Sequence, residues 1–457
     1  MIDQEDTIAA IATPHGKGGI AIVRVSGALA LKAARIITGT TPKARTAYFR
    51  HFKYKNRIVD EGVLLYFAAP NSYTGEDVVE FQGHAGIAAP RQVLNAVLSI
   101  EGIRQAKPGE FTCRAFLNNK MDLTAAEAVE DLISANSAGA ARAALSSLEG
   151  KFATYLNQLT AELTSLRARL EACLDFPEEH EDFFDSGKAL DELNKVIAHA
   201  ESAVSAATQG IRLSEGARIV LSGPPNAGKS SLLNALAGSE RAIVTDIPGT
   251  TRDILDAEIE IQGIAVNITD TAGIRSTPAD EIESIGISKA LAELKKADLI
   301  LLIIDGSSPA PYAMETLTKI REAGIDNDRI LIVVSKADLK DDDNTRCLLE
   351  QEPFSSFQQV RSSAKVQGGL EELKQTLTAR LNLTSTEGAF SARRRHLAEL
   401  NLALNAIRNG REILKGGDLV LCARELREAQ EHVGKITGKV TSDELLGKIF
   451  STFCIGK

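Results

Sequence analysis

The chain has 457 residues, of which 44% are hydrophobic and 25% are charged. At about 150 residues per domain this length predicts several folding units, and the hydrophobic fraction excludes disorder over most of the chain. Five cysteines are scattered without a CxxC pair, and no apolar run reaches the roughly 18 residues that a membrane span needs. We therefore expect no disulfide framework, no membrane span and a reducing, cytoplasmic location.

The net charge of −9 is distributed unevenly. Residues 1–120 hold 15 basic and 10 acidic side chains, residues 121–387 hold 25 and 43, and residues 388–457 hold 12 and 8. This distribution argues against a protein that binds nucleic acid over its whole surface. It does not exclude a local basic binding surface.

The chain divides into four segments that differ in composition and in the spacing of their hydrophobic residues. In residues 1–120, short β-branched runs such as 20–25 and 62–67 lie between turn signals, which predicts a mixed β domain with one or two helices. In residues 121–215, leucine and alanine recur at helical spacing, which predicts long amphipathic helices. The acid-rich segment 175–185 within them reads as a surface loop, with a metal site as the alternative.

In residues 216–380 short apolar strands alternate with helical stretches, the pattern of a doubly wound, mainly parallel α/β sheet. The strands are expected at 218–222, 266–269, 299–304 and 330–335. Helical texture returns in residues 381–457, at 396–414 and 419–433. The prediction is a multidomain α/β protein in which an α/β domain is inserted into a discontinuous helical domain.

The strongest local pattern is a GxxxxGKS loop at residues 223–230, between an expected strand and an expected helix. Glycines let backbone N–H groups surround phosphate oxygens, and the helix directs its positive end at them. Lys229 would reach the β- and γ-phosphates, and the Ser230 hydroxyl would bind Mg²⁺. The loop and the first turn also place these residues around the nucleotide: Asn226, Ala227, Gly228 and Ser231.

Four further elements follow in the order of a GTP-binding domain, and they resemble translation-factor-related GTPases. They are Gly249–Asp253 with Thr250 and Thr251, Asp270–Gly273 with Thr271 and Ala272, Ser335–Asp338 with Lys336, and Ser363–Lys365 with Ala364. Thr251 would bind Mg²⁺, and Asp338 would accept two N–H groups of guanine. Ser335 stands where the usual asparagine is expected, which predicts weaker affinity for the base.

The catalytic water lacks an obvious partner. Ile274 occupies the position where Ras-like enzymes carry a glutamine, and no arginine finger is evident. Glu283, in the acidic stretch 280–286, is a candidate for orienting the water. The alternative is that these carboxylates are simply solvated.

Taken together, the segments are similar to the bacterial and organellar tRNA-modification GTPases of the MnmE (TrmE) family, over essentially the whole chain. The terminal FCIGK, Phe453–Lys457, is the most specific match. Further matching segments are 6–19, 72–77, 82–84, 108–112, 114–117 and 122–127.

The resemblance implies a reaction on tRNA. Family members act with a flavoprotein partner to add an aminomethyl or carboxymethylaminomethyl group to carbon 5 of the wobble uridine, U34, with a folate as one-carbon donor. Residues 1–120 would form a folate-binding and dimerisation domain. The family's residues for 5-formyl-tetrahydrofolate correspond to Arg24, Glu80, Lys120 and Lys457. Cys454 would belong to the modification site, with packing as the alternative role. Without the resemblance, Arg24 and Lys120 would be interpreted as surface cations.

For the GTPase domain the resemblance implies a potassium ion in place of the arginine finger, completed when two GTPase domains meet in a homodimer. Its ligands would come from Asn226, Thr245, Ile247 and Thr250, with Asp246 and Pro248 also at the nucleotide. Glu283 would then orient the water.

Two other functions remain open at this point. A GTP-dependent ribosome-assembly or RNA-binding switch could use the same GTPase domain, but it would carry an RNA-binding module instead of the folate-like domain and the FCIGK tail. A folate-dependent aminomethyltransferase with a regulatory GTPase domain would differ in its substrate.

Overall fold

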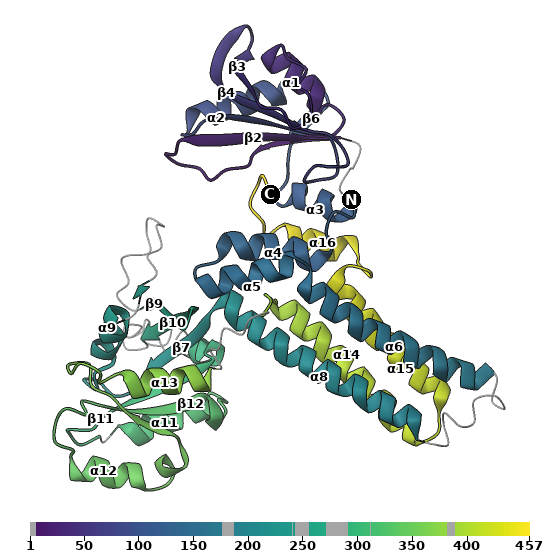
Figure 1. Ribbon diagram of the computed structural model, residues 1–457. Helices are drawn as coiled ribbons and strands as arrows, with labels where there is room; N and C mark the ends of the chain where they lie inside the picture. The colour runs from purple at the N-terminus through teal and green to yellow at the C-terminus, as the bar shows by residue number, and fades with distance from the viewer. Residues whose placement is uncertain are drawn as a thin grey trace, which may run out of the picture. The chain divides into compact units, whose positions relative to one another are not determined.

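The computed structural model describes residues 6–175, 187–239, 241–242, 256–270, 291–310, 312–381 and 389–457 (Figure 1). The chain forms two compact units. Unit 1 contains residues 1–130, 147–203 and 398–457, and unit 2 contains residues 131–146 and 204–397. Of the acid-rich segment 175–185 expected to be a surface loop, only Asp175 is described, as a helical residue, and residues 176–185 lie outside the described residues.

Unit 1 contains a six-stranded sheet in the order β3-β4-β5-β2-β1-β6. Its strands are β1 (Thr7–Ile11), β2 (Ile20–Ser26), β3 (Tyr48–Tyr54), β4 (Arg57–Phe67), β5 (Val78–His84) and β6 (Ile103–Gln105). Neighbouring strands are antiparallel except β1 and β6, which are parallel.

Two helices, α1 (Ala30–Thr38) and α2 (Ala88–Leu98), cover one face of this sheet. Their buried side chains pack against strand residues such as Val23, Leu64 and Phe81. A third helix, α3 (Glu110–Leu117), corrects the expectation of one or two helices in this part of the chain. The sequence hides α3 because Glu110–Ala115 are all buried, so the helix has no polar face that would reveal its period.

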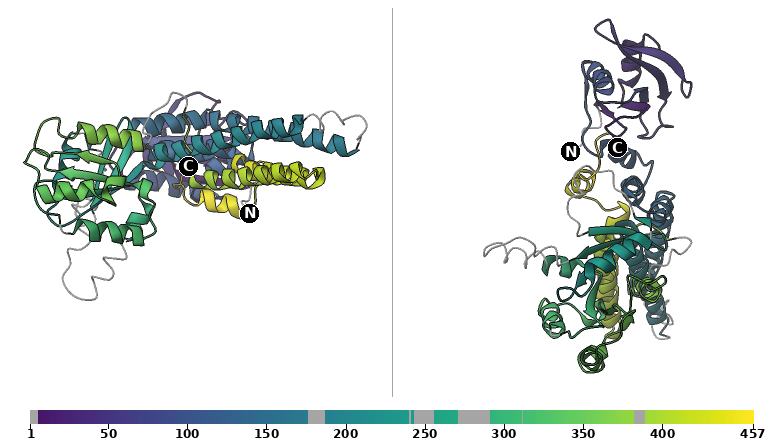
Figure 2. Two further views of the ribbon diagram at one scale, coloured as in Figure 1. Left: turned by 90° about the horizontal axis from the view of Figure 1, so that it is seen from below. Right: turned by 90° about the vertical axis from the view of Figure 1, so that its left-hand side faces the viewer.

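The remaining helices of the chain's helical segments range from 8 to 28 residues in length. They are α4 (Leu123–Ser134), α5 (Ala138–Leu148), α6 (Lys151–Asp175), α8 (Lys188–Glu215), α14 (Arg394–Lys415), α15 (Leu419–Thr437) and α16 (Asp443–Phe450). Helix α6 buries leucines at intervals of three and four residues, and it lies beside α15 (Figures 1 and 2). Helix α16 packs against α3 through Phe450 and Cys113.

Unit 2 contains a seven-stranded sheet in the order β13-β12-β11-β7-β10-β9-β8. Its strands are β7 (Ala217–Ser222), β8 (Arg241–Ala242), β9 (Asp256–Ile261), β10 (Ile264–Asp270), β11 (Leu299–Asp305), β12 (Ile330–Ser335) and β13 (Gln359–Arg361). The five from β13 to β10 are parallel, and β9 and β8 extend the sheet in antiparallel fashion.

Helices cover both faces of this sheet. The helices of unit 2 include α9 (Lys229–Ser239), α11 (Ala313–Glu322), α12 (Asp343–Glu350) and α13 (Glu371–Arg380), with short 3₁₀ turns at Asn327–Arg329 and Phe354–Ser356. One core joins Leu221 to α9 and α13, and the other joins Val220 to α11. Successive β7 residues thus point to opposite cores, as a doubly wound sheet requires.

Candidate functional site

The GxxxxGKS loop connects the end of β7 to the start of α9, so the phosphate-binding pattern lies at the carboxyl end of a parallel strand. Two of its residues have backbone conformations that favour glycine. Gly223 has φ 152° and a Cβ there would lie 2.4 Å from the Ile303 carbonyl oxygen, while Gly228 has φ 93°. The loop can therefore pass close to β11 and turn its amides inward.

Lys229 is held inside this loop by the backbone. Its Nζ donates to the carbonyl oxygens of Gly223 at 2.9 Å and of Pro224 at 2.7 Å, and the residue is only 6% exposed. Phosphate oxygens can replace carbonyl oxygens as acceptors for an ammonium group, so the position suits a phosphate ligand.

Ser230 and Asp270 meet in the manner expected of a magnesium site. The Ser230 hydroxyl donates to Asp270 Oδ2 at 3.2 Å, and Asp270 ends β10 at 1% exposure. The parallel register pairs Asp270 with Leu221 of β7, one residue before that strand ends. A hydroxyl and a carboxylate are the hard oxygen donors that Mg²⁺ prefers.

The expected base-binding residues also come together. Ser363 Oγ donates to Asp338 Oδ1 at 2.6 Å, and the Lys365 amide donates to Ser363 Oγ at 3.2 Å. The hydrogen bond from Ser363 lowers the pKa of Asp338, which keeps this carboxyl group ionised and able to accept N–H donors. Lys336 Nζ bonds Asp305 Oδ2 at 2.5 Å and anchors the segment to β11.

Ser335 has a role in the loop. Its hydroxyl donates to the Ala227 carbonyl oxygen at 2.6 Å, and the residue is 5% exposed. The hydroxyl thus joins the end of β12 to the phosphate loop and contacts the protein backbone. Within the segment 335–338, the carboxylate is that of Asp338.

Several expected nucleotide and metal residues lie outside the described residues: Thr245, Asp246, Ile247, Pro248, Gly249, Thr250, Thr251, Thr271, Ala272, Gly273 and Glu283. Ile274 lies there as well. Asn226 is described, and it holds a positive φ of 62° within the loop.

In unit 1 the antiparallel register of β2 and β5 places Arg24 opposite Glu80. Arg24 Nε donates to Glu80 Oε1 at 3.0 Å, and Gln82 Nε2 donates to Glu80 Oε2 at 3.0 Å. The Arg24 guanidinium lies over the rings of Tyr73 at 5.3 Å and Phe111 at 5.7 Å. A largely buried ion pair is therefore framed by two aromatic rings.

The C-terminal residues are bound to the start of α3. The Phe111 amide donates to the Lys457 carbonyl at 3.2 Å, and the Gly109 amide donates to the Cys454 carbonyl at 3.3 Å. A Cβ at Gly456 would lie 2.2 Å from the Ile11 carbonyl oxygen, so this close approach requires glycine. Because the Phe111 ring also contacts Arg24, the tail ends beside the Arg24–Glu80 pair.

Lys120 meets a neighbouring loop. Its Nζ donates to the Pro70 carbonyl at 2.9 Å, and Tyr73 of the same loop contacts Arg24. The structure thus brings Arg24, with its partner Glu80, and the Lys457 backbone to Phe111. It ties Lys120 to the loop whose Tyr73 contacts Arg24.

Cys454 is exposed, whereas Cys113 on α3 is buried. Burial, with the nearby Glu110 charge, raises the pKa of the Cys113 thiol to about 12. Of these two cysteines, Cys454 is the one whose thiol is accessible to a substrate.

Comparison with known proteins identifies the family. The model of the TrmE N-terminus matches residues 7–120, and the model of the MnmE helical domain matches residues 123–454. The tRNA modification GTPase MnmE of Shewanella denitrificans is 46% identical over 463 residues, covering 99% of both chains, and that of Pseudomonas paraeruginosa is 46% identical over 460 residues with the same coverage. The chain belongs to the MnmE family of tRNA modification GTPases.

This MnmE-family chain is a GTP-hydrolysing enzyme. A solved structure of the Aquifex aeolicus GTPase Era with GDP and AlF4⁻ is 24% identical and covers 41% of this chain and 66% of its own, with a TM-score of 0.28. Within the described ranges, no helix combines the length and apolarity of a membrane span.

Sequence reasoning missed a buried network of charges in the MnmE-family N-terminal segment. Arg114 is fully buried and its guanidinium bonds Asp6 Oδ1 at 2.5 Å, Glu76 Oε1 at 3.1 Å and Glu110 Oε1 at 3.2 Å. Arg104 also bonds Glu110, at 2.8 Å, and Asp6, at 2.6 Å. Burial is the largest single influence on Asp6 and Glu110 and opposes their ionisation. The hydrogen bonds and charges of Arg104 and Arg114, with the Lys107 amide at Glu110, together outweigh it and lower the pKa of both.

This network fixes the start of α3 to the start of β1, next to the C-terminal tail. Its signal in the sequence is weak, because Asp6 and Arg114 are 108 positions apart and charged residues usually lie on the surface. The segments 108–112 and 114–117 contain two residues of the network, Glu110 and Arg114, but their residue types alone do not identify their ion-pair partners.

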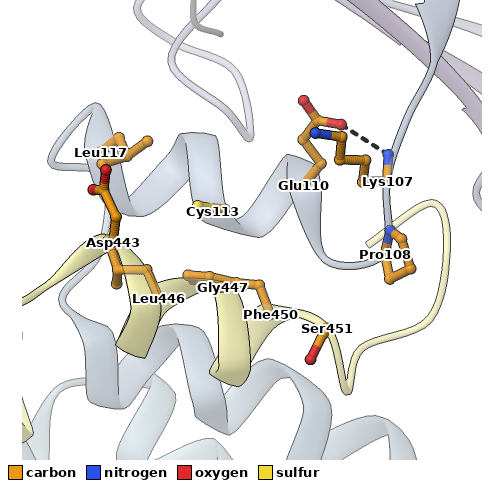
Figure 3. A pocket seen from close by; sticks show the side chains of 10 residues that line it. All are labelled: Lys107, Pro108, Glu110, Cys113, Leu117, Asp443, Leu446, Gly447, Phe450 and Ser451. Atoms are coloured by element: carbon orange, nitrogen blue, oxygen red, sulfur yellow. Dashed lines mark hydrogen bonds between the residues drawn. The ribbon is translucent and has the colours of Figure 1, made fainter. Parts of the chain in front are cut away.

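A cavity of about 470 Å³ lies between α3 and α16 (Figure 3). Its lining residues are Lys107, Pro108, Glu110, Cys113, Leu117, Asp443, Leu446, Gly447, Phe450 and Ser451. The Glu110 carboxylate in its wall accepts from the Lys107 amide at 2.8 Å. The cavity therefore lies where α3 packs against the C-terminal segment, next to the charge network at Glu110.

Proposed function

We propose that this protein uses GTP hydrolysis to drive modification of tRNA, adding an aminomethyl or carboxymethylaminomethyl group to carbon 5 of U34 together with a flavoprotein partner. The observation that carries the proposal is the attachment of the Cys454–Lys457 tail to α3, beside the Arg24–Glu80 pair, in a chain of the MnmE family. Relatives over the full length are named tRNA modification GTPases, which supports tRNA as the substrate and favours this function over a ribosome-assembly switch.

A folate, 5-formyl-tetrahydrofolate or a relative, would supply the one-carbon unit when bound. Lys120 and Lys457 would face its carboxylates. The Arg24–Glu80 pair would lie at the pterin, where Glu80 would accept N–H groups and Arg24 would hold the Glu80 carboxylate in place. The donor set fits: a carboxylate 9% exposed, a guanidinium and two flat rings suit a planar heteroaromatic ligand with N–H donors and anionic groups. Cys454, exposed at the same tail, would provide the thiol of the modification site.

For GTP hydrolysis, Ser230 and Thr251 would hold Mg²⁺, and Asn226, Thr245, Ile247 and Thr250 would hold K⁺. The potassium charge would stabilise the transition state where an arginine finger is missing, and Glu283 would align the attacking water. We expect hydrolysis at saturating GTP and Mg²⁺ to be nearly absent when sodium replaces potassium. Equal turnover in the two salts would contradict the potassium site.

A homodimer formed through the N-terminal domain is supported by the second face of the six-stranded sheet. The register aligns Val63, Gln82 and Ile22 on the face opposite to the core that α1 and α2 cover. At its margins Ile20 is 66% exposed and Phe49 is 64% exposed. Exposed apolar side chains on one sheet face favour association. The five cysteines, all free, support a cytoplasmic location.

The decisive test is mass spectrometry of wobble nucleosides in cells that lack this protein. We expect the modified uridine to disappear and to return with the wild-type gene but not with Lys229→Ala. Normal modified uridine in the deletion strain would refute the proposed function. A return with Lys229→Ala would show that GTP binding is not required.

A further inference from the structure

The hairpin formed by β3 and β4, with the loop before it, is strongly basic. Residues 40–58 contain six lysines and arginines and no aspartate or glutamate, and the rest of β4 adds two acidic residues, Asp60 and Glu61. The six cations are Lys43, Arg45, Arg50, Lys53, Lys55 and Arg57. Much of the surplus positive charge of residues 1–120 is thus concentrated in one hairpin.

These six cations are not neutralised within the part of the chain that the structure describes: no ion pair joins any of them to a carboxylate there. Arg50 lies over the Tyr48 ring at 5.3 Å and Lys55 over the Tyr54 ring at 5.2 Å, contacts that orient a cation without cancelling its charge. By contrast, Arg24, Arg104 and Arg114 of the same domain are all paired with carboxylates.

Two of the six cations, Arg50 and Lys53, lie on β3. Lys55 and Arg57 lie at the turn to β4 and at its first residue, and Lys43 and Arg45 precede β3. Strand β3 is the outermost strand of the sheet, and its turn to β4 is made by Lys55 and Asn56, both with positive φ (Figure 1). Lys43, Lys53 and Arg57 are exposed. The seven residues of β3, at about 3.3 Å each, span roughly 20 Å, so the cations form a row and not a point.

We propose that this hairpin binds the sugar-phosphate backbone of the tRNA substrate. A group of cations without a carboxylate partner among the described residues, five of the six exposed, is the electrostatic footprint of a polyanion site. Lysines on an edge strand can also serve only to prevent edge-to-edge pairing of sheets, but Lys43, Arg45 and Arg57 lie outside β3 and do not protect that edge. The inference rests on the proposed function, because tRNA is the polyanion that this family modifies.

The test compares two full-length variants with the same loss of charge. The first is Lys53→Gln/Lys55→Gln/Arg57→Gln in the hairpin. The matched control is Lys296→Gln/Lys319→Gln/Arg346→Gln in unit 2, where each cation is exposed and paired with a nearby carboxylate. Binding of an unmodified tRNA transcript with uridine at the wobble position is measured as a function of salt concentration.

We expect the hairpin variant to bind the tRNA about tenfold more weakly at about 50 mM salt, and the slope of log K against log salt to fall by roughly 1 to 2. The control should match the wild type. Melting curves verify that each variant is folded. If the triple variant is unstable, a second variant, Lys43→Gln/Arg45→Gln in the loop before β3, should also weaken tRNA binding.

Binding and slope equal to the wild type in both hairpin variants would overturn the proposal, as would equal losses in hairpin variant and control. A change in oligomeric state by light scattering with unchanged tRNA binding would assign the edge to pairing with a second copy and would also overturn it. The proposed function is tested separately, by the wobble nucleosides of the deletion strain. If modification is lost there but the hairpin variants bind tRNA normally, only the hairpin proposal fails.

Discussion

The two units hold their key cations in different ways. In unit 1, Arg114 is buried among the carboxylates of Asp6, Glu76 and Glu110. In unit 2, Lys229 donates to backbone carbonyls of its own loop. A buried guanidinium cannot leave its carboxylates without exposing uncompensated charges to a low dielectric, whereas an ammonium on carbonyls can exchange them for phosphate oxygens. The first arrangement stabilises a fold and the second prepares a ligand site.

The largest effect is therefore expected at Arg114. Arg114→Leu leaves three carboxylates around an apolar side chain and should destabilise the N-terminal domain by about 3–5 kcal/mol. The urea midpoint of that domain, followed by circular dichroism or hydrogen exchange, measures the loss. Lys55→Gln on the exposed turn is the control and should leave the midpoint unchanged. Equal midpoints for Arg114→Leu and the wild type would mean that the network is not structural.

Acid should remove part of the same stabilisation. The pKa values of Asp6 and Glu110 in the folded protein lie below the unfolded values of 3.8 and 4.5, so their contribution is complete above those values and disappears as the pH falls through the folded ones. The midpoint of the N-terminal domain should thus decrease below about pH 4.5. In Arg104→Gln the urea midpoint should decrease less steeply with falling pH. An equally steep decrease in this variant would contradict the pairing of Arg104 with Asp6 and Glu110.

A smaller effect is expected at Ser335. Ser335→Ala removes the donor to the Ala227 carbonyl, and the affinity for GTP and GDP should fall alike by about tenfold. Ser335→Thr keeps the hydroxyl and should restore binding, as measured by fluorescent-nucleotide titration. If instead the two nucleotides keep their affinity and only the preference for guanine over adenine declines, the hydroxyl acts on the base.

The smallest effect on stability is expected at the tail. Cys454→Ser should change the free energy of unfolding by less than about 0.5 kcal/mol, because the side chain is exposed. It should nevertheless abolish U34 modification, since a hydroxyl is too weakly acidic to replace a thiolate near pH 7. Cys347→Ser, at the other exposed cysteine, should leave modified nucleoside levels intact. Full modification by Cys454→Ser would mean that the Cys454 thiol takes no part in the reaction.

Local patterns in the sequence determined the elements that carry the nucleotide site. The apolar run 330–335 is β12, and the GxxxxGKS spacing lies between β7 and α9, because strand alternation, helical period and glycine placement are properties of neighbouring residues. The four-part division of the chain at residues 120, 215 and 380 remains a prediction, as do the roles of residues outside the described ranges.

Tertiary structure alone decided which charges meet. Arg24 and Glu80 are 56 positions apart and pair through the register of β2 and β5, while Arg114 reaches Asp6 across 108 positions. In a sequence these residues look like ordinary surface charges, and so do the cations of the β3–β4 hairpin. Whether a charge is compensated depends on burial and on partners that only the folded chain brings within hydrogen-bonding distance, and this is why α3, the charge network and the basic edge had to be found in the structure.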